Sequence, residues 1–351
     1  MPSFESACRL VEEAVQNKVC SCAALAIGRG GDLYVKKAWG RLRFPDGPAA
    51  DEETLYDLAS MTKILSTTMV AFHALENGLL TLYDPLGRFL PVPKDKLSIT
   101  VKHLMTHTSG LTDHIMLQDA VKDPREAVSC ILSSPLQGVP GGQVIYSCMG
   151  YLLLGRILET VYGKPLDILA RELVYAPLGM AHTGYLPKGD NIAATEIDPD
   201  TGEPLCGVVH DENARFLGGV AANAGLFSTI GDCAVFASML ACGGKHGGKP
   251  YLSPAMMQAA LRNYTPGMDQ HRGLGFHLGG TEGNFTGDLF PPESFGHTGF
   301  TGTSLVVDQK TGLFVVLLTN RVHPTRQQSG HLRLRRTLHN AVYAEYSRAQ
   351  G

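Results

Sequence analysis

A serine and a lysine three residues apart form the most reactive pair that the sequence offers. They are Ser60 and Lys63, in the stretch YDLASMTKIL that covers residues 56–65. On a helix this spacing places both side chains on one face, one turn apart. A serine hydroxyl is a poor nucleophile until an adjacent base takes its proton, and lysine can be that base when burial and nearby positive charge lower its pKa. Taken alone, the pair also fits a serine helix cap followed by a solvated lysine.

Two further stretches combine polar and aromatic residues in a way that could serve chemistry. Tyr146 and Ser147 precede a strongly apolar run in QVIYSCMGYLLLG, residues 143–155. A tyrosine near two positive groups can shuttle protons, whereas the plain alternative is an aromatic residue before a serine cap. His297–Gly299 reads HTG. A polar residue and a glycine at a strand edge let a substrate backbone lie alongside, and the plain alternative is a glycine-rich turn before a strand.

The order of these motifs along the chain carries more information than any one motif. Ser-x-x-Lys comes first, Tyr-Ser second and His-Thr-Gly third, with LMTHTSGL at Leu104–Leu111 and NAGLFST at Asn223–Thr229 between them. With these five motifs the sequence resembles the serine β-lactamase and penicillin-binding-protein superfamily from about residue 25 to residue 320. It is most similar to the class C-like branch, which includes DD-peptidases, D-aminopeptidases and β-lactamase-like (family VIII) carboxylesterases.

The resemblance implies a role for each matching position. It makes Ser60 the acylated residue, Lys63 its base or the partner of that base, and Tyr146 the group that takes and returns the proton. His297 stands where the family usually has a lysine. The implied oxyanion hole consists of the backbone N–H groups of Ser60 and Phe300. Further candidates for the substrate pocket are Cys148, Thr298 and Gly299. The resemblance implies neither a cofactor nor a metal.

The sequence departs from the family pattern at two positions. Cys148 stands two residues after the motif tyrosine, where the family usually has asparagine. A thiol offers neither a strong donor nor a strong acceptor to an amide of the substrate. His297 replaces the third-motif lysine and is only partly charged at neutral pH, so it would hold a substrate carboxylate less firmly. Both departures favour an ester substrate over a carboxylated lactam. Cys148 as a second nucleophile is the weaker interpretation, because a cysteine beside an apolar run behaves as a small hydrophobe.

Lys-Thr-Gly, the third motif in the form that the family usually has, occurs thirteen residues after His297. Lys310–Gly312 reads KTG, but it follows Asp308 and joins two apolar, β-branched stretches. We therefore interpret Gly312 as a turn residue and Lys310 as a solvated loop charge. The inexact copy at His297–Gly299 is expected to open the strand that lines the site, and this choice also favours an esterase over a lactamase.

Several alternatives remain open on the sequence. A D-amino-acid peptidase or amidase, a weak β-lactamase and an acyltransferase would all use the same residues. A non-catalytic binding protein on the same fold would predict the loss of Ser60, Lys63 or Tyr146, and all three are present.

His103 and His107 have the i, i+4 spacing of metal ligands but lack the accompanying glutamate. The polar segment at residues 210–214 is either a border of the pocket or a solvated loop. No serine lies in a Gly-x-Ser-x-Gly elbow, and no phosphate-binding loop is present.

The composition restricts the kinds of protein that this chain can be. The 351 residues are 44% hydrophobic and 18% charged, which fits a globular enzyme with a sizeable core. The formal net charge of −3 gives no reason to expect nucleic acid or an anionic membrane as a partner. We expect a small-molecule ester or amide as the partner, with the oligomeric state left open. The first residues lack a signal-peptide pattern, no apolar run is long enough for a membrane span, and the eight cysteines carry no framework spacing. A cytoplasmic protein with reduced thiols is therefore expected.

Local patterns predict strands at both ends of the chain and helices between them. Strands are expected at residues 23–28, 33–39, 303–308 and 313–320, and helices at 4–17, 60–77, 101–105, 147–162, after Pro165, 228–241 and 326–346. This order predicts an α+β fold, in which an antiparallel sheet formed from both chain ends is flanked by helices and carries an inserted, mostly helical domain. We expect residues 1–79 and 248–351 to form the sheet domain and residues 80–247 the insertion, with the active site at their interface.

Overall fold

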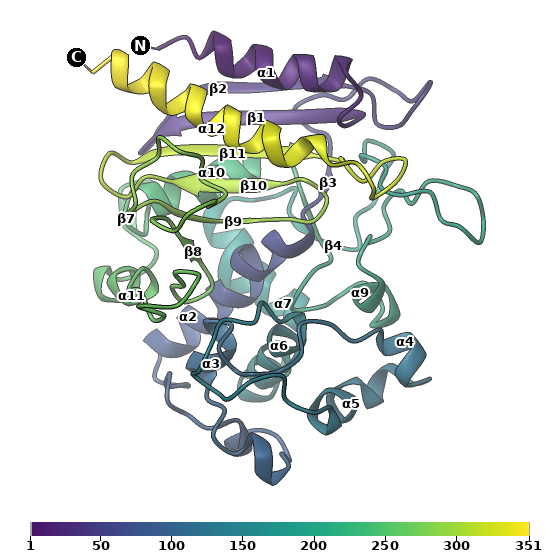
Figure 1. Ribbon diagram of the computed structural model, residues 1–351, viewed down its shortest axis with the longest axis vertical. Coiled ribbons are helices and arrows are strands. Elements are labelled where there is room, and N and C mark those ends of the chain that lie inside the picture. The colour runs from purple at the N-terminus through teal and green to yellow at the C-terminus, as the bar shows by residue number, and fades with distance from the viewer. Residues whose placement is uncertain (1, 351) are drawn as a thin grey trace.

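The computed structural model describes residues 2–350 (Figure 1). In this part of the chain six strands form one antiparallel sheet in the order β2-β1-β11-β10-β9-β8. The strands are β1 (Cys22–Arg29), β2 (Asp32–Gly40), β8 (His277–Leu278), β9 (Phe295–Thr298), β10 (Ser304–Val307) and β11 (Leu313–Thr319). Strand β1 pairs with β11, so the two ends of the sequence meet in the middle of the sheet, as expected.

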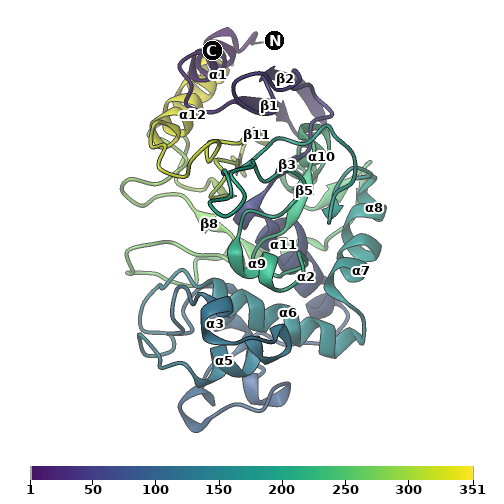
Figure 2. The same ribbon diagram turned by 90° about the vertical axis from the view of Figure 1, so that its right-hand side faces the viewer.

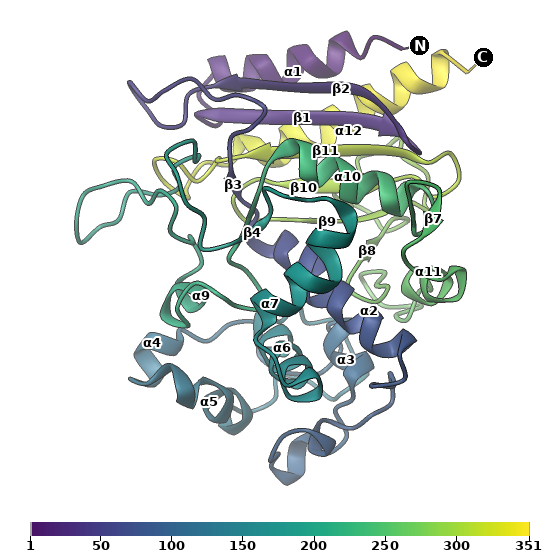
Figure 3. The same ribbon diagram turned by 180° about the vertical axis from the view of Figure 1, so that it is seen from behind.

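Helices cover both faces of the sheet. The long helices α1 (Glu5–Gln16) and α12 (Gly330–Arg348) contact each other over one face, and α10 (Ile230–Ala241) packs on the other (Figures 1 and 3). Strand β1 shows why both faces are needed, because all but one of its residues are buried. Ala24 and Ala26 belong to the larger core, whereas Leu25 and Ile27 belong to the core beneath α1 and α12. This alternation is the two-residue period of a strand.

The remaining helices form a second layer below the sheet in Figures 1 and 2, well separated from α1 and α12. They are α2 (Thr68–Glu76), α3 (Val101–Met105), α4 (Leu117–Ala120), α5 (Ala127–Ser133), α6 (Cys148–Tyr162), α7 (Leu166–Ala170), α8 (Ala176–Leu178), α9 (Glu212–Phe216) and α11 (Pro254–Ala260). A small sheet, β3 (Tyr56–Asp57), β5 (Leu226–Ser228) and β4 (Gly184–Tyr185), connects the layers, and β6 (Lys245–His246) pairs with β7 (Lys249–Pro250). The expected α+β fold is confirmed, and the division into two domains stays a proposal.

Most predicted elements are present within one or two residues of their expected ends. The helix expected to begin at Ser228 begins at Ile230, because residues 226–228 pair with β3 and Thr229 caps the helix through the N–H of Asp232. The final helix begins at Gly330 and not at residue 326. The residues before it are held elsewhere, since the Arg326 side chain binds Glu196 and the carbonyls of residues 326 and 328 accept hydrogen bonds from Arg321.

Two further expectations can be compared with the structure. All eight cysteines lie in the described part of the chain and are free thiols, as expected. Within residues 2–350, no helix has the length and apolar character that crossing a bilayer requires.

Candidate active site

The turn that presents Ser60 is strained and firmly braced. Ser60 lies in a 3-10 turn, Ala59–Met61, and Ala59 has a φ of 46°, in the left-handed region that a non-glycine residue rarely adopts. The buried Asp57 carboxylate accepts the N–H of Ala59 at 2.8 Å and the N–H of His210 at 2.7 Å. Strain of this kind persists only where the surroundings hold it, and it is concentrated at functional sites.

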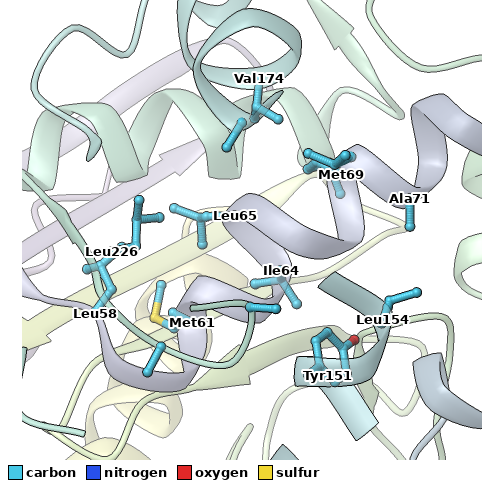
Figure 4. Packing of buried hydrophobic residues seen from close by; sticks show 14 of the residues in the cluster. Leu58, Met61, Ile64, Leu65, Met69, Ala71, Tyr151, Leu154, Val174 and Leu226 are labelled. Carbon is cyan, nitrogen blue, oxygen red and sulfur yellow. The ribbon is translucent and has the colours of Figure 1, made fainter. Parts of the chain in front are cut away.

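The segment after Ser60 is not the regular α-helix that the sequence predicts. Residues Lys63–Thr67 form one π-helical turn before α2 begins at Thr68. Met61, Ile64 and Leu65 point into the surrounding core and anchor this segment (Figure 4). The expected face is nevertheless shared, since Lys63 Nζ lies 3.2 Å from Ser60 Oγ. Isolated π-turns inside helices are common at functional sites.

Lys63 is completely buried, so the solvated alternative is excluded. Its Nζ donates to the Asn223 carbonyl at 3.0 Å and to Cys148 Sγ at 3.5 Å, and it lies 5.0 Å from the centre of the Tyr146 ring. No carboxylate lies within ion-pair distance of it in the described chain. Asn223 belongs to the NAGLFST stretch, whose part in holding the lysine was not foreseen.

The pKa of Lys63 bears on whether this lysine can be the base. Burial lowers this pKa, but the neighbouring Cys148 and Tyr146, which attract the ammonium when they are ionised, outweigh burial and raise it above the ordinary value of 10.5. The lowered pKa that a lysine base requires is therefore not found, because the two ionisable groups that lie nearest outweigh burial.

The Tyr146 hydroxyl is buried and has no hydrogen-bond partner in the described structure. The residue stands just before α6, which is capped by Ser147 through the N–H of Gly150. The Ser147 N–H in turn donates to Nδ1 of His107 at 3.1 Å, and the His107 ring lies 4.4 Å from the Tyr146 ring. The Tyr-Ser pair therefore has two roles. Ser147 caps α6, and Tyr146 holds a buried hydroxyl without a partner next to that helix.

The LMTHTSGL stretch has a structural part in this arrangement. His107 is buried and packs against Tyr146, and burial followed by the charges of Arg272 and Lys63 lowers its pKa far below 6.5. His103 Nδ1 accepts the N–H of Thr100, at the start of α3. The described residues contain no cluster of three or more candidate metal ligands. The spacing of the two histidines is explained by these packing and capping contacts.

His297–Gly299 closes a strand and does not open one. Phe295–Thr298 form β9, and the chain turns at Gly299 before it enters β10. His297 is 3% exposed, and its Nδ1 donates to the Thr298 carbonyl at 2.8 Å, which leaves Nε2 as an unpaired acceptor. Burial, followed by the charges of Lys63 and Arg272, holds its pKa well below 6.5. The imidazole is therefore neutral at pH 7, where the sequence suggested partial charge.

Gly299 is needed because the turn after β9 lies directly against the Ser60 segment. A Cβ on Gly299 would come within 2.4 Å of the Leu58 carbonyl oxygen and 2.1 Å of Thr303 Oγ1. Thr303 and Thr301 donate side-chain hydrogen bonds to the carbonyls of Leu58 and Asp57, at 3.1 and 2.7 Å. The turn that carries Phe300 is thus tied to the two residues that precede Ala59.

Replacing Gly299 with alanine should lower kcat/KM for an ester by about 10- to 100-fold, because an added methyl must push β9 away from Ser60 and small displacements of reacting groups are costly. Gly31→Ala is the matched control, since a Cβ there meets nothing within 4 Å. Steady-state kinetics and melting temperatures of both variants check this expectation. Equal activity of the two variants would mean that the close approach does not matter.

Three residues complete the surroundings of the site. Cys148 is the first residue of α6 and is partly buried beside Lys63, as the family position implies. Arg272 is 5% exposed and lies over the Tyr146 ring, 5.5 Å from its centre; no sequence pattern marked it. His210 is buried, and its Nε2 lies 3.1 Å from the Glu196 carboxylate. His210 supports Asp57 through its backbone N–H, so the polar segment that begins at His210 is not a solvated loop at this first residue.

The Lys-Thr-Gly match at Lys310–Gly312 lies away from this site. Lys310 is exposed in the turn between β10 and β11, and Gly312 has a φ of 74° there. The Asp308 carboxylate binds the Lys310 N–H and the Thr311 hydroxyl. The turn interpretation of the literal KTG is confirmed.

Comparisons with known proteins match these features. The family model described as Beta-lactamase matches residues 8–339. A protein of Escherichia coli K12 named "Putative D-alanyl-D-alanine carboxypeptidase" is 32% identical over 340 residues, which cover 85% of this chain and 78% of that protein. The solved structure "EstCE1, a hydrolase with promiscuous acyltransferase activity" has a TM-score of 0.77 at 22% identity and covers 97% of this chain and 98% of its own. Simvastatin synthase (LovD) from Aspergillus terreus has a TM-score of 0.77 at 20% identity, with 99% of both chains covered.

The two structural likenesses establish a shared fold, and the family match and the curated relative establish kinship. Together with the recognised order of motifs, they show that this chain belongs to the beta-lactamase family.

Proposed function

We propose that this protein is a serine hydrolase that acts through an acyl-enzyme on a carboxylic ester or an activated amide, with a small-acyl ester as the preferred substrate. One observation carries the proposal. The Ser60 hydroxyl lies 3.2 Å from a fully buried lysine, beside a buried tyrosine hydroxyl that has no other partner. A nucleophile, a cation and a free proton carrier within one small volume are the groups that acyl transfer requires.

In the first step Ser60 Oγ attacks the substrate carbonyl carbon and loses its proton. A lysine with a raised pKa is a weak candidate to accept that proton at pH 7. We therefore assign Lys63 the role of partner of the base, and we assign Tyr146, whose buried hydroxyl has no other partner, the role of the group that takes the proton and returns it. Tyr146 then returns the proton to the leaving group as the carbonyl re-forms. Water then attacks the acyl-enzyme with the same proton transfers in the reverse order, which releases the acid and regenerates Ser60.

The charge that develops on the carbonyl oxygen needs donors that are already in position. The backbone N–H groups of Ser60 and Phe300 are the proposed pair, because Phe300 follows Gly299 in the turn that lies against the Ser60 segment. Phe300 itself is 49% exposed, and its ring lies 4.3 Å from the Arg321 guanidinium. This contact restrains the turn.

The choice of an ester rests on what stands at the two altered positions. Cys148 offers weak hydrogen bonding to an amide side chain, and the neutral His297 offers no charge to a carboxylate at that position. The structural neighbour EstCE1 is named a hydrolase, which supports hydrolysis but not a particular substrate. A peptidase on D-amino acids is the second candidate, and the name of the Escherichia coli relative supports it. An acyltransferase is compatible with the same residues, and the name of the EstCE1 structure includes that activity.

A substrate screen with one purified protein tests the proposal. We expect the highest kcat/KM for short-chain p-nitrophenyl esters, lower values for D-amino amides, and the lowest for penicillins and cephalosporins. The Ser60→Ala variant, measured in parallel, gives the background of each assay. A D-alanyl amide or a β-lactam that is turned over faster than every ester would overturn the assignment of substrate but leave the acyl-enzyme intact.

A further inference from the structure

Two buried polar residues beside Ser60 and Phe300 have no part in the proton transfers proposed above. They are Asp57, which is 2% exposed, and His210, which is 4% exposed. His210 is the first residue of the polar segment at residues 210–214, which the sequence could place either at the pocket or in a solvated loop. The two residues are joined, because the His210 N–H donates to Asp57 Oδ2 at 2.7 Å.

Asp57 holds the Ser60 side of the proposed oxyanion hole. Its Oδ1 accepts the N–H of Ala59 at 2.8 Å, and Ala59 is the residue with a φ of 46° directly before Ser60. The direction of the Ser60 N–H depends on this strained conformation, which persists only while its surroundings hold it. Burial raises the pKa of the Asp57 carboxyl, although the N–H groups of His210 and Ala59 lower it in part. The carboxyl group is thus kept in surroundings that disfavour its charge.

The imidazole of His210 holds the Phe300 side. Its ring stacks on the Phe300 ring, with 5.7 Å between the ring centres and 23° between the planes. His210 Nε2 lies 3.1 Å from the Glu196 carboxylate, so the imidazole cannot turn away from the stack without losing that contact. Arg321 adds a further restraint, since its Nε donates to the Phe300 carbonyl at 2.7 Å. The residue that carries the second proposed donor is therefore held through its ring and through its carbonyl.

The backbone at His210 is itself anchored by the residue that follows it. The Asp211 carboxylate accepts the N–H of Ala214 at 2.8 Å and so caps α9. The same oxygen accepts the side-chain amide of Asn223 at 3.3 Å, and the Asn223 carbonyl binds Lys63. His210 is therefore a fixed point between the nucleophile turn and the turn after β9.

We propose that Asp57 and His210 are a pair of positioning residues that fixes the two backbone donors of the oxyanion hole relative to each other. The inference rests on the proposed function, because it takes the N–H groups of Ser60 and Phe300 as those donors. Asp57 holds one turn, the His210 ring holds the other, and the hydrogen bond between the pair joins them. Donors that are already in position stabilise the developing charge without having to move. Loss of either contact should therefore weaken binding of the transition state more than binding of the substrate.

Phenylboronic acid tests this pair, because its tetrahedral adduct with a serine nucleophile resembles the transition state. Its inhibition constant is measured together with kcat and KM for p-nitrophenyl acetate. In Asp57→Asn and in His210→Ala, kcat/KM should fall by about 10- to 100-fold while KM changes by less than about 3-fold. The inhibition constant should rise by the same factor as kcat/KM falls. Because only active molecules report this constant, a loss of folded protein does not change it.

Two further variants separate the contacts of the pair. His210→Phe keeps a ring that can stack on Phe300, so its kcat/KM should stay within about 3-fold of the wild type. A loss as large as that of His210→Ala would overturn the role of the ring. The double variant Asp57→Asn/His210→Ala should lose little more than the weaker of the two single variants, because residues that act as one unit have non-additive effects.

Asp232→Asn and His73→Ala are the matched controls. Asp232 is a buried aspartate whose pKa burial also raises, and its carboxylate accepts the N–H of His182 at 2.8 Å. His73 packs edge-on against the Tyr251 ring, and its Nε2 lies 3.0 Å from that hydroxyl. Both residues lie outside the candidate site, in α10 and α2. Both variants should keep the wild-type inhibition constant, whatever their melting temperatures.

The outcomes distinguish this inference from the proposed function. If the wild type hydrolyses the ester and both single variants keep its inhibition constant, the positioning pair is overturned and the serine hydrolase stands. The pair is also overturned if the double variant loses the full product of the two single losses, because the residues then act independently. If the wild type neither hydrolyses the ester nor binds the boronic acid, the serine hydrolase is overturned together with the pair.

Discussion

Ser60→Ala is expected to reduce kcat/KM for p-nitrophenyl acetate by about 10⁴-fold or more, to the level that binding and the oxyanion donors alone provide. The reason is direct, because no other hydroxyl in the described structure lies within hydrogen-bond distance of Lys63 Nζ. Ser60 is only partly buried, so loss of one oxygen should leave the fold intact. The melting temperature should therefore change little, which separates loss of chemistry from loss of protein.

Ser129→Ala serves as its matched control. Ser129 is an exposed serine at the start of a helix, and its hydroxyl binds only the Glu126 carbonyl. This variant should retain wild-type turnover. If Ser60→Ala kept more than about a tenth of the wild-type rate, a value far above the residual expected for a missing nucleophile, Ser60 would not be the nucleophile.

Lys63→Met is expected to lower kcat by about 10²- to 10⁴-fold, the range for loss of a group that assists proton transfer. Methionine fills a similar volume, and it removes a buried cation that has no carboxylate partner in the described chain. The variant should therefore be at least as stable as the wild type. Measurement of kcat together with urea unfolding checks both halves of this expectation.

The control for Lys63→Met is Lys188→Met, which removes an exposed lysine outside the candidate site. Its kcat should match the wild type. A near-wild-type kcat for Lys63→Met would show that the lysine is structural. A large loss of stability would contradict the view that the buried charge is kept for chemistry and not for the fold.

Much of this site could be predicted because its groups belong to local patterns. Ser60 and Lys63 share one helical face, and Tyr146 stands next to a serine cap, so short windows of sequence contain the geometry. The same is true of the hairpin at Lys310–Gly312, where glycine punctuates two apolar strands. Strand periodicity likewise places alternate residues of β1 in opposite cores.

The remaining features arise from contacts between distant segments. Asp57 is braced against His210, and Arg335 reaches the Thr303 carbonyl, across separations that no periodic pattern encodes. Arg272 lies over the Tyr146 ring for the same reason. The direction of the Lys63 pKa depends on Cys148, which is 85 residues away along the chain. Composition indicates that such groups exist, but only the fold shows which of them meet.

The most direct test of the central claim is to locate the covalent adduct of a fluorophosphonate probe by intact mass and peptide mapping. One adduct per chain is expected, on the Ser60 hydroxyl; it should disappear in Ser60→Ala and persist in Ser129→Ala. An adduct on Cys148, or single labelling that survives the loss of Ser60, would show that Ser60 is not the nucleophile.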